Sequence, residues 1–70
     1  MVVKNFIREY RKEAGISQEE LAVALNVSRQ TIYAIETGKY NPSLELSLGM
    51  ARYFGVTVEA LFKLEEEAHG

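Results

Sequence analysis

The stretch from residue 17 to 39 constrains the fold most, because it predicts two short helices joined by a tight turn. Ser17 and Glu20 have the spacing of a capping box, in which each side chain bonds the backbone N–H of the other residue. A helix is therefore expected over residues 18–25, with its apolar residues on one face. Asn26 follows the last of these residues, and asparagine tolerates the left-handed conformation that ends a helix.

A second helix is expected over about residues 29–37. Ser28 is its N-cap, and Gly38 supplies the positive φ that commonly follows a helix. Val27 is the one apolar residue of the turn and is expected to plug into the core. The short turn between the two helices has the length found in a helix-turn-helix, whose second helix can lie in the major groove of DNA.

From residue 7 to about residue 64 the chain resembles the Cro/phage-repressor type helix-turn-helix, the XRE family of prokaryotic transcriptional regulators. The resemblance is carried by SQEELAVALNVSRQTIYAIETGKYNPSLELSLGMARYFGV, preceded by REYRKEAGI. It implies a five-helix lambda-repressor-like DNA-binding domain. The predicted helices, separated by short breaks, indicate an all-α fold, and the length of the chain indicates that residues 1–70 form a single domain. It also implies a sequence-specific, double-stranded-DNA-binding transcriptional regulator, acting as a homodimer on a palindromic site.

The apolar spacing outside the motif predicts three more helices. The first runs from Val3 to Ala14, and the second spans 44–54 behind the cap Ser43. The third follows the cap Thr57 and continues its apolar residues as far as Leu64. Residues 65–70 are expected to form a frayed acidic tail.

Polar residues on the outer side of the 29–37 helix are the predicted readers of DNA bases. Arginine can bond guanine O6 and N7, and glutamine can bond adenine N6 and N7. Tyr33 can pack on a thymine methyl group or donate to a phosphate, and Ala34 can meet a methyl group or contact nothing. The predicted base-contacting residues are Arg29, Gln30, Tyr33 and Ala34.

A second set of residues is predicted to contact phosphates. By resemblance, Gln18 bonds the DNA backbone at a helix N-terminus, where free N–H groups favour an anion. The resemblance also implies that the loop 38–41 lies along the DNA backbone. Thr31 is ambiguous between a phosphate contact and half-buried packing. The set consists of Gln18, Ser28, Thr31, Thr37, Lys39 and Asn41.

Arg11 lies beside the apolar stripe of the first predicted helix, where a solvated charge with its stem on that stripe is the simple interpretation. The resemblance implies instead that Arg11 forms a partly buried structural ion pair with Glu36.

The helix 44–54 is apolar nearly all round, which is more than one buried face requires. The surplus predicts a dimer contact made by Leu46, Met50, Tyr53 and Leu64. The same surplus, with the acidic balance of the chain, supports the alternative function: a protein-interaction module such as an antitoxin, an adaptor or a coactivator-like factor. Gly49 has no evident role beyond a close approach of helices.

Composition narrows the remaining possibilities. The 70 residues contain no cysteine and a single histidine, His69, so thiolate metal sites, disulfides and histidine clusters are excluded. No cofactor motif or catalytic cluster is visible, so we expect no enzyme activity, no cofactor, no metal and no small-molecule ligand. No signal peptide or membrane span is evident, so a cytoplasmic protein that joins the nucleoid when bound to DNA is expected.

The formal net charge of −2 counts mildly against a nucleic-acid partner, but the charges are unevenly distributed. Residues 1–40 carry six basic and five acidic side chains, whereas residues 41–70 carry two basic and five acidic ones. Because the local field steers a polyanion, the acidic excess lies outside the predicted DNA-binding half.

Overall fold

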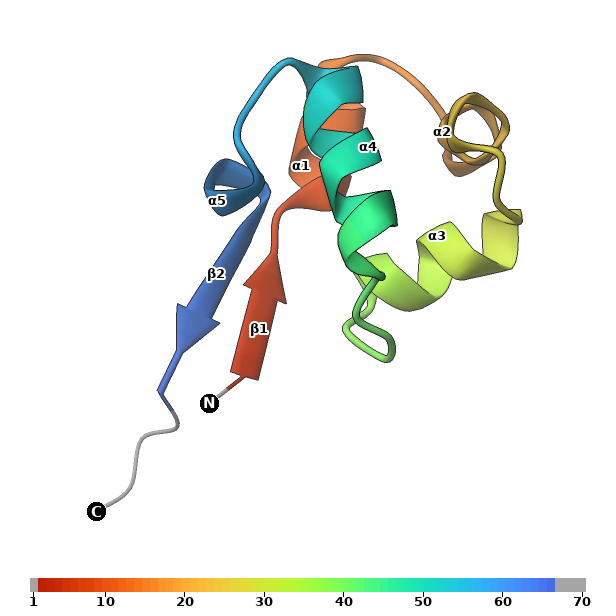
Figure 1. Cartoon of the computed structure of the whole chain (residues 1–70). Helices are drawn as coiled ribbons and strands as arrows, with labels where there is room; N and C mark the ends of the chain where they lie inside the picture. The colour runs from red at the N-terminus through yellow and green to blue at the C-terminus, as the bar shows by residue number, and fades with distance from the viewer. Residues whose placement is uncertain (1, 67–70) are drawn as a thin grey trace.

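Five helices pack around a small apolar core, and the two ends of the described chain pair as a two-stranded ribbon (Figure 1). The computed structural model describes residues 2–66. In chain order the elements are β1 (Val2–Asn5), α1 (Ile7–Glu13), α2 (Gln18–Leu25), α3 (Arg29–Glu36), α4 (Leu44–Phe54), α5 (Val58–Leu61) and β2 (Phe62–Glu65). None of the helices among residues 2–66 has the length and apolar character needed to cross a membrane.

Hydroxyl caps set the beginnings of four helices where the sequence predicts them. In each case the side-chain oxygen accepts a hydrogen bond from the backbone N–H three residues later. The caps are Ser17, Ser28, Ser43 and Thr57. The capping box of Ser17 and Glu20 is complete, with both of its hydrogen bonds formed.

The core draws at least one fully or nearly fully buried apolar side chain from each helix. Its members are Ile7, Leu21, Ala22, Ile32, Ile35, Met50, Ala51 and Leu61. Removing a large side chain of this kind from water contributes about 1.5–3 kcal/mol. Burial of this shared core therefore holds α2 and α3 at a fixed angle to the rest of the domain.

The burial of Met50 corrects the predicted dimer contact, because this side chain is fully buried and cannot reach a partner. The core-facing stripe of α4 runs through Ser47, Met50 and Ala51. This stripe is hard to recognise in the sequence, because the polar residue Ser47 is unexpected on a core-facing side. Burial of Ser47 is possible because its hydroxyl donates to the carbonyl of Ser43 at 2.9 Å.

The all-α prediction is wrong at both ends of the chain. Residues 3–5, expected as the first turn of a helix, lie instead in β1, which pairs antiparallel with β2, with Val2 opposite Glu65 and Asn5 opposite Phe62. The helix after Thr57 accordingly ends at Leu61. Adjacent β-branched residues at the N-terminus and alternating apolar and charged residues in β2 both favour strands.

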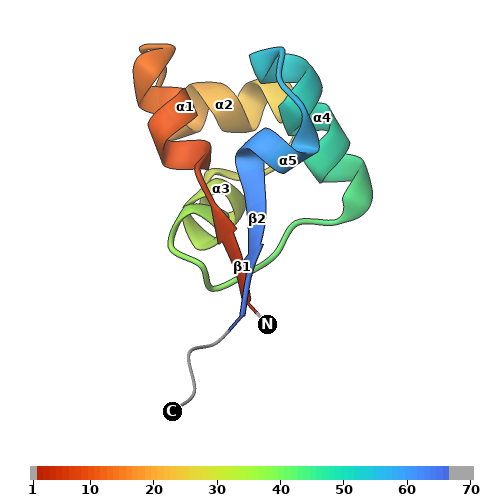
Figure 2. The same ribbon diagram turned by 90° about the vertical axis from the view of Figure 1, so that its left-hand side faces the viewer.

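The ribbon projects from the helical body toward the chain ends (Figure 1, Figure 2). Glu65, expected in a frayed tail, lies in β2, and residues 67–70 of that predicted tail lie outside the described residues.

Candidate nucleic-acid interface

The turn between α2 and α3 fixes the relative direction of the two helices. Asn26 adopts the left-handed conformation, with φ 58°, and ends α2. Val27 is half-buried and packs against the core, and this contact anchors the turn to the core. Ser28 returns to an extended conformation and begins α3. The arrangement is a helix, a tight turn and a second helix, with the second helix on the surface (Figure 1).

One side of α3 packs into the core, and the other side faces solvent. Ile32 and Ile35 are fully buried. Arg29 and Gln30 are exposed in the first turn, and half of the Tyr33 side chain is exposed. Ala34, the fourth predicted base-contacting residue, is half-buried beside this outer side. The outer side of α3 therefore presents an arginine, a glutamine and a tyrosine on a rigid element.

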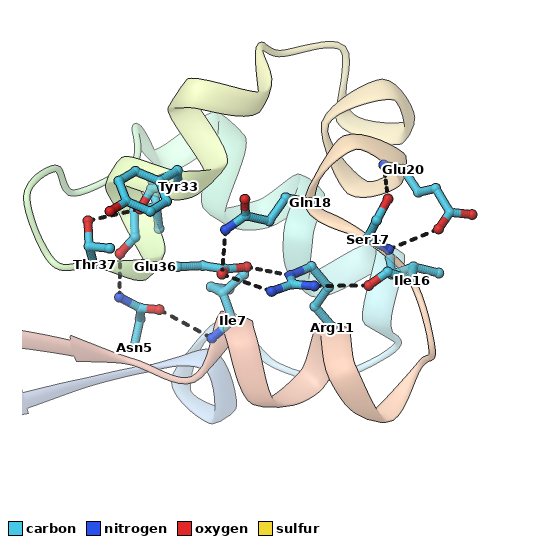
Figure 3. A network of polar contacts seen from close by, with 11 residues as sticks. Asn5, Ile7, Arg11, Ile16, Ser17, Gln18, Glu20, Tyr33, Glu36 and Thr37 are labelled. Carbon is cyan, nitrogen blue, oxygen red and sulfur yellow. Dashed lines mark hydrogen bonds and ion pairs between the residues drawn. The ribbon is translucent and has the colours of Figure 1, made fainter.

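A buried ion pair joins α1 to the last turn of α3 (Figure 3). Arg11 Nε donates to Glu36 Oε2 at 2.7 Å, and Arg11 Nη2 donates to Glu36 Oε1 at 3.1 Å. The remaining Nη1 donates to the carbonyl of Ile16 at 3.0 Å. Only 11% of the Arg11 side chain and 3% of the Glu36 side chain are exposed.

This geometry matches the pair implied by the resemblance, and it is bidentate, the strongest form of arginine–carboxylate contact. The hydrogen bond to Glu36 raises the pKa of Arg11 above its ordinary value, helped by the charge of Glu36 and opposed by burial.

Gln18 joins the same network from the first turn of α2 (Figure 3). Its Nε2 donates to Glu36 Oε1 at 3.1 Å. The carboxylate fixes the orientation of the amide, because only the nitrogen end can donate to it. The Nε2 group carries two hydrogens, so one donor remains beyond the bond to Glu36. The sequence reasoning placed Gln18 at the DNA but missed this link to the ion pair.

The hydroxyl groups assigned to phosphates are engaged within the protein to different degrees. Thr37 Oγ1 donates to the carbonyl of Tyr33 at 2.9 Å, which leaves only its lone pairs for another partner. The Ser28 and Thr31 hydroxyls lie 2.9 Å apart, and either can be the donor. One of these two hydroxyls consequently keeps a hydrogen that can point outward.

The loop after α3 stays close to the outer side of that helix. Gly38 has φ 79°, and the backbone N–H of Lys39 donates to the carbonyl of Ala34 at 2.9 Å. The ammonium of Lys39 lies 6.0 Å from the centre of the Tyr33 ring, and Asn41 is exposed. Lys39 and Tyr33 therefore share one surface.

A surface hollow of about 340 Å³ between α1 and α3 shows two basic residues that the sequence reasoning left unassigned. Arg8 and Lys12 line it together with Gln18, Tyr33 and Thr37. Both are exposed and stand four residues apart on α1, so they lie on one helix face. That spacing was visible in the sequence, but only the packing of α1 against α3 indicates what the two side chains face.

Asn5 is a second residue that the sequence reasoning missed. Its Nδ2 donates to the carbonyl of Ile35 at 2.8 Å, and its Oδ1 accepts from the backbone N–H of Ile7 at 3.2 Å (Figure 3). Asn5 thus satisfies the first N–H of α1, one residue before the N-cap Phe6, and ties this helix to the end of α3. An asparagine directly before an apolar helical run was the available signal.

The other residues predicted at a dimer contact lie outside this surface. Leu46 is half-buried and packs against the core, whereas Tyr53 and Leu64 are exposed. Among residues 2–66 no group of three or more histidine, cysteine or acidic side chains is placed to hold a metal ion.

Comparison with known proteins agrees with this geometry. The helix-turn-helix family HTH_3 matches residues 7–61. An HTH-type transcriptional regulator of Methanocaldococcus jannaschii is 49% identical over 65 residues, which are 93% of this chain and 98% of the relative. YgzD, an HTH-type transcriptional regulator of Bacillus subtilis, is 46% identical over the same shares of the two chains. The crystal structure of the restriction-modification controller protein C.AhdI from Aeromonas hydrophila superposes with a TM-score of 0.71 at 31% identity, covering 77% of this chain and 82% of that one.

Proposed function

Because the chain belongs to the helix-turn-helix family of the XRE, or Cro/phage-repressor, type, we propose that it regulates transcription by sequence-specific binding of double-stranded DNA. In this proposal α3 enters the major groove, and the domain acts without catalysis. The observation that carries the proposal is the exposed first turn of α3, where Gln30 lies opposite the buried isoleucines and Arg29 flanks them.

Base reading is assigned to the outer side of α3. Arg29 would bond the O6 and N7 of a guanine, and Gln30 would bond the N6 and N7 of an adenine. Tyr33 would pack on a thymine methyl group or donate to a phosphate. Ala34, half-buried beside them, would meet a methyl group or contact nothing.

Phosphate contacts would surround this helix and set its register on the duplex. Gln18 would use its second amide hydrogen, and the Ser28–Thr31 pair would supply one outward hydroxyl hydrogen. Lys39 and Asn41 would follow the backbone from the loop after α3. In the observed rotamer Thr37 has no hydrogen to donate to a phosphate, so we assign it to holding the end of α3.

Arg8 and Lys12 extend the proposed phosphate surface onto α1. Each is an exposed cation that borders the hollow beside Gln18 and Tyr33. Arg29 stands at the start of α3 and Lys39 in the loop after it, so four basic residues gather around this helix and favour a polyanion although the net charge is −2.

One domain reads few base pairs, so we further propose that two copies bind a palindromic site. Their half-sites would lie about 34 Å apart, one turn of DNA, or a multiple of that distance.

The test is selection of bound duplexes from a random DNA library, followed by salt titration of the winning sequence. We expect a palindrome with guanine in each half-site and affinity that falls steeply with salt, by about 0.9 log units per log unit of salt for each phosphate contact. Arg29→Ala is expected to lower discrimination at one position by about 1–3 kcal/mol. Arg52→Ala, an exposed arginine on α4, is the matched control and should leave the selected site unchanged.

Two results would contradict the proposal. Unchanged selection by the Arg29→Ala protein would remove α3 from base reading. No enriched sequence from the folded protein would favour the protein-interaction alternative, for which the exposed residues Leu44, Leu48 and Tyr53 of α4 are the surface to examine.

A further inference from the structure

The edge of β2 that faces away from β1 has no neighbouring strand among residues 2–66, so its backbone hydrogen-bonding groups are open to a further strand. Phe6, one residue beyond β1, donates its N–H to the carbonyl of Leu61 at 2.9 Å. In an antiparallel ladder, hydrogen-bonded pairs alternate with non-hydrogen-bonded pairs. With the observed register, the backbone N–H and C=O groups of Lys63 and Glu65 form hydrogen bonds to β1. Those of Leu64 point away from β1. β1 lies between β2 and α3, so this edge faces away from the helix that presents the proposed DNA contacts (Figure 1).

The two faces of the ribbon differ in character. Val3 and Leu64 are opposite each other on one face, and both are exposed, Leu64 by 69%. Lys4 and Lys63 are opposite each other on the other face. Like charges placed directly across a pair of strands are destabilising, and a two-stranded ribbon alone is marginally stable. The ribbon therefore carries both an unmatched charge and uncovered apolar surface.

We propose that β2 pairs antiparallel with β2 of a second copy of this chain, about a two-fold axis that passes between the Leu64 residues of the two copies. In this register the two Leu64 residues exchange N–H and C=O hydrogen bonds. The N–H of Glu66 bonds the carbonyl of Phe62 in the other copy. The N–H of Phe62 takes no part, because it already donates to Val58 within its own chain. The product is a continuous four-stranded sheet.

Charge selects this register over its neighbour. Centring the pair on Leu64 sets Lys63 of each copy opposite Glu65 of the other, in the non-hydrogen-bonded positions where side chains approach most closely. Centring it on Lys63 would set that lysine against itself. β1 contains no acidic residue, so its own outer edge offers Lys4 no opposite charge.

A lysine on an edge strand can also serve to prevent pairing. That interpretation accounts for Lys63 alone, but not for the glutamate two residues later, which matches the lysine of a second copy across the axis. The other face supports pairing as well. The Val3 and Leu64 side chains of both copies would form one apolar row across all four strands, covering surface that each copy exposes alone.

This inference specifies the subunit contact of the homodimer in the proposed function, and so it rests on that function for its biological meaning. Its test needs no DNA. The oligomeric state of the full chain is measured by sedimentation velocity over a concentration series, for the unaltered protein and for charge-reversed variants.

Lys63→Glu sets acidic residues against each other across the proposed axis, and Glu65→Lys sets basic residues against each other. Each is expected to weaken dimerisation by roughly 10- to 100-fold, because two cross-strand pairs change from attraction to repulsion. An equimolar mixture of the two variants is expected to form a heterodimer, since each lysine then meets a glutamate. Lys63→Glu also places an acidic residue opposite Lys4 within its own chain, so loss of the ribbon cannot explain loss of the dimer.

Lys4→Glu is the matched control, because it changes the same cross-strand pair from the β1 side and should leave the dimer intact. The proposal is overturned by a monomeric unaltered protein, by single variants that dimerise as tightly as the unaltered chain, or by no heterodimer in the mixture. It is also overturned if Tyr53→Arg on α4 abolishes the dimer while Lys63→Glu does not. A dimer that follows these rules but selects no DNA sequence would refute the proposed function and leave the β2 contact standing.

Discussion

Arg11→Ala is the substitution whose effect on the domain can be worked out most fully from the structure. It removes two of the three hydrogen bonds that the Glu36 carboxylate accepts and leaves the single bond from Gln18. The Glu36 side chain is only 3% exposed, so its charge depends on these donors and is poorly solvated without them. The carbonyl of Ile16 loses its partner as well.

The expected loss is large relative to the stability of so small a domain. Removing one partner of a buried ion pair typically costs about 3–5 kcal/mol. A chain of this length is stabilised by roughly 4–10 kcal/mol in total. Since each kcal/mol lowers the melting temperature of a domain of this size by about 4–8 °C, we expect Arg11→Ala to melt at least ~12 °C lower.

Urea and thermal unfolding followed by circular dichroism measure this effect. Arg8→Ala, an exposed arginine on the same helix, is the control and should change stability by less than about 0.5 kcal/mol. The double variant Arg11→Met/Glu36→Met should lose less than Arg11→Ala, because it leaves no buried charge without a partner. A loss below about 1 kcal/mol for Arg11→Ala would refute the argument that the unpaired Glu36 charge is what destabilises the variant.

The remaining stability predictions use the same unfolding measurements. Gly49→Ala is expected to stabilise α4 by about 0.5–1 kcal/mol, because the added Cβ would lie 3.7 Å from Leu25 Cδ2, an ordinary contact. Gly55→Ala should instead destabilise by about 1 kcal/mol, since Gly55 has φ 70°; equal effects of the two changes would contradict this reasoning. Asn5→Ala is expected to lose about 1–3 kcal/mol, because the N–H of Ile7 loses its partner and the carbonyl of Ile35 keeps only the N–H of Gly38. The exposed Asn41→Ala is its control, and a comparable loss there would argue against a special role for Asn5.

The middle of the chain could be predicted because its signals are local. In α2, α3 and α4 a serine side chain accepts a hydrogen bond from the backbone N–H three residues later, and apolar residues follow at helical spacing. These two signals specify the helices without reference to other segments. Ile32 and Ile35 define the inner side of α3, so its outer side follows by geometry.

The ends could not be predicted because their structure depends on pairing between opposite ends of the chain. Val3 has the right spacing for the stripe of α1, and Leu64 continues the apolar residues of α5. Strand pairing overrides both, since each four-residue segment finds a partner only in the other. The links of Gln18 to Glu36 and of Asn5 to Ile35 were missed for the same reason: each requires the distance between two packed elements.

The Arg11–Glu36 pair also bears on how an acidic chain could bind DNA. Glu36 stands in the last turn of α3, where the helix dipole already disfavours a negative charge and where a phosphate backbone would add repulsion. The guanidinium of Arg11 neutralises that carboxylate, and its charge is therefore not available to a phosphate. The cations left to attract DNA are those exposed around the pair, on α1, at the start of α3 and in the loop after it: Arg8, Lys12, Arg29 and Lys39. Counting formal charges over the whole chain consequently understates the attraction at this surface, because these four cations are exposed there, whereas Glu36 is already paired and the exposed Glu19 is the one carboxylate beside Gln18 and Arg29.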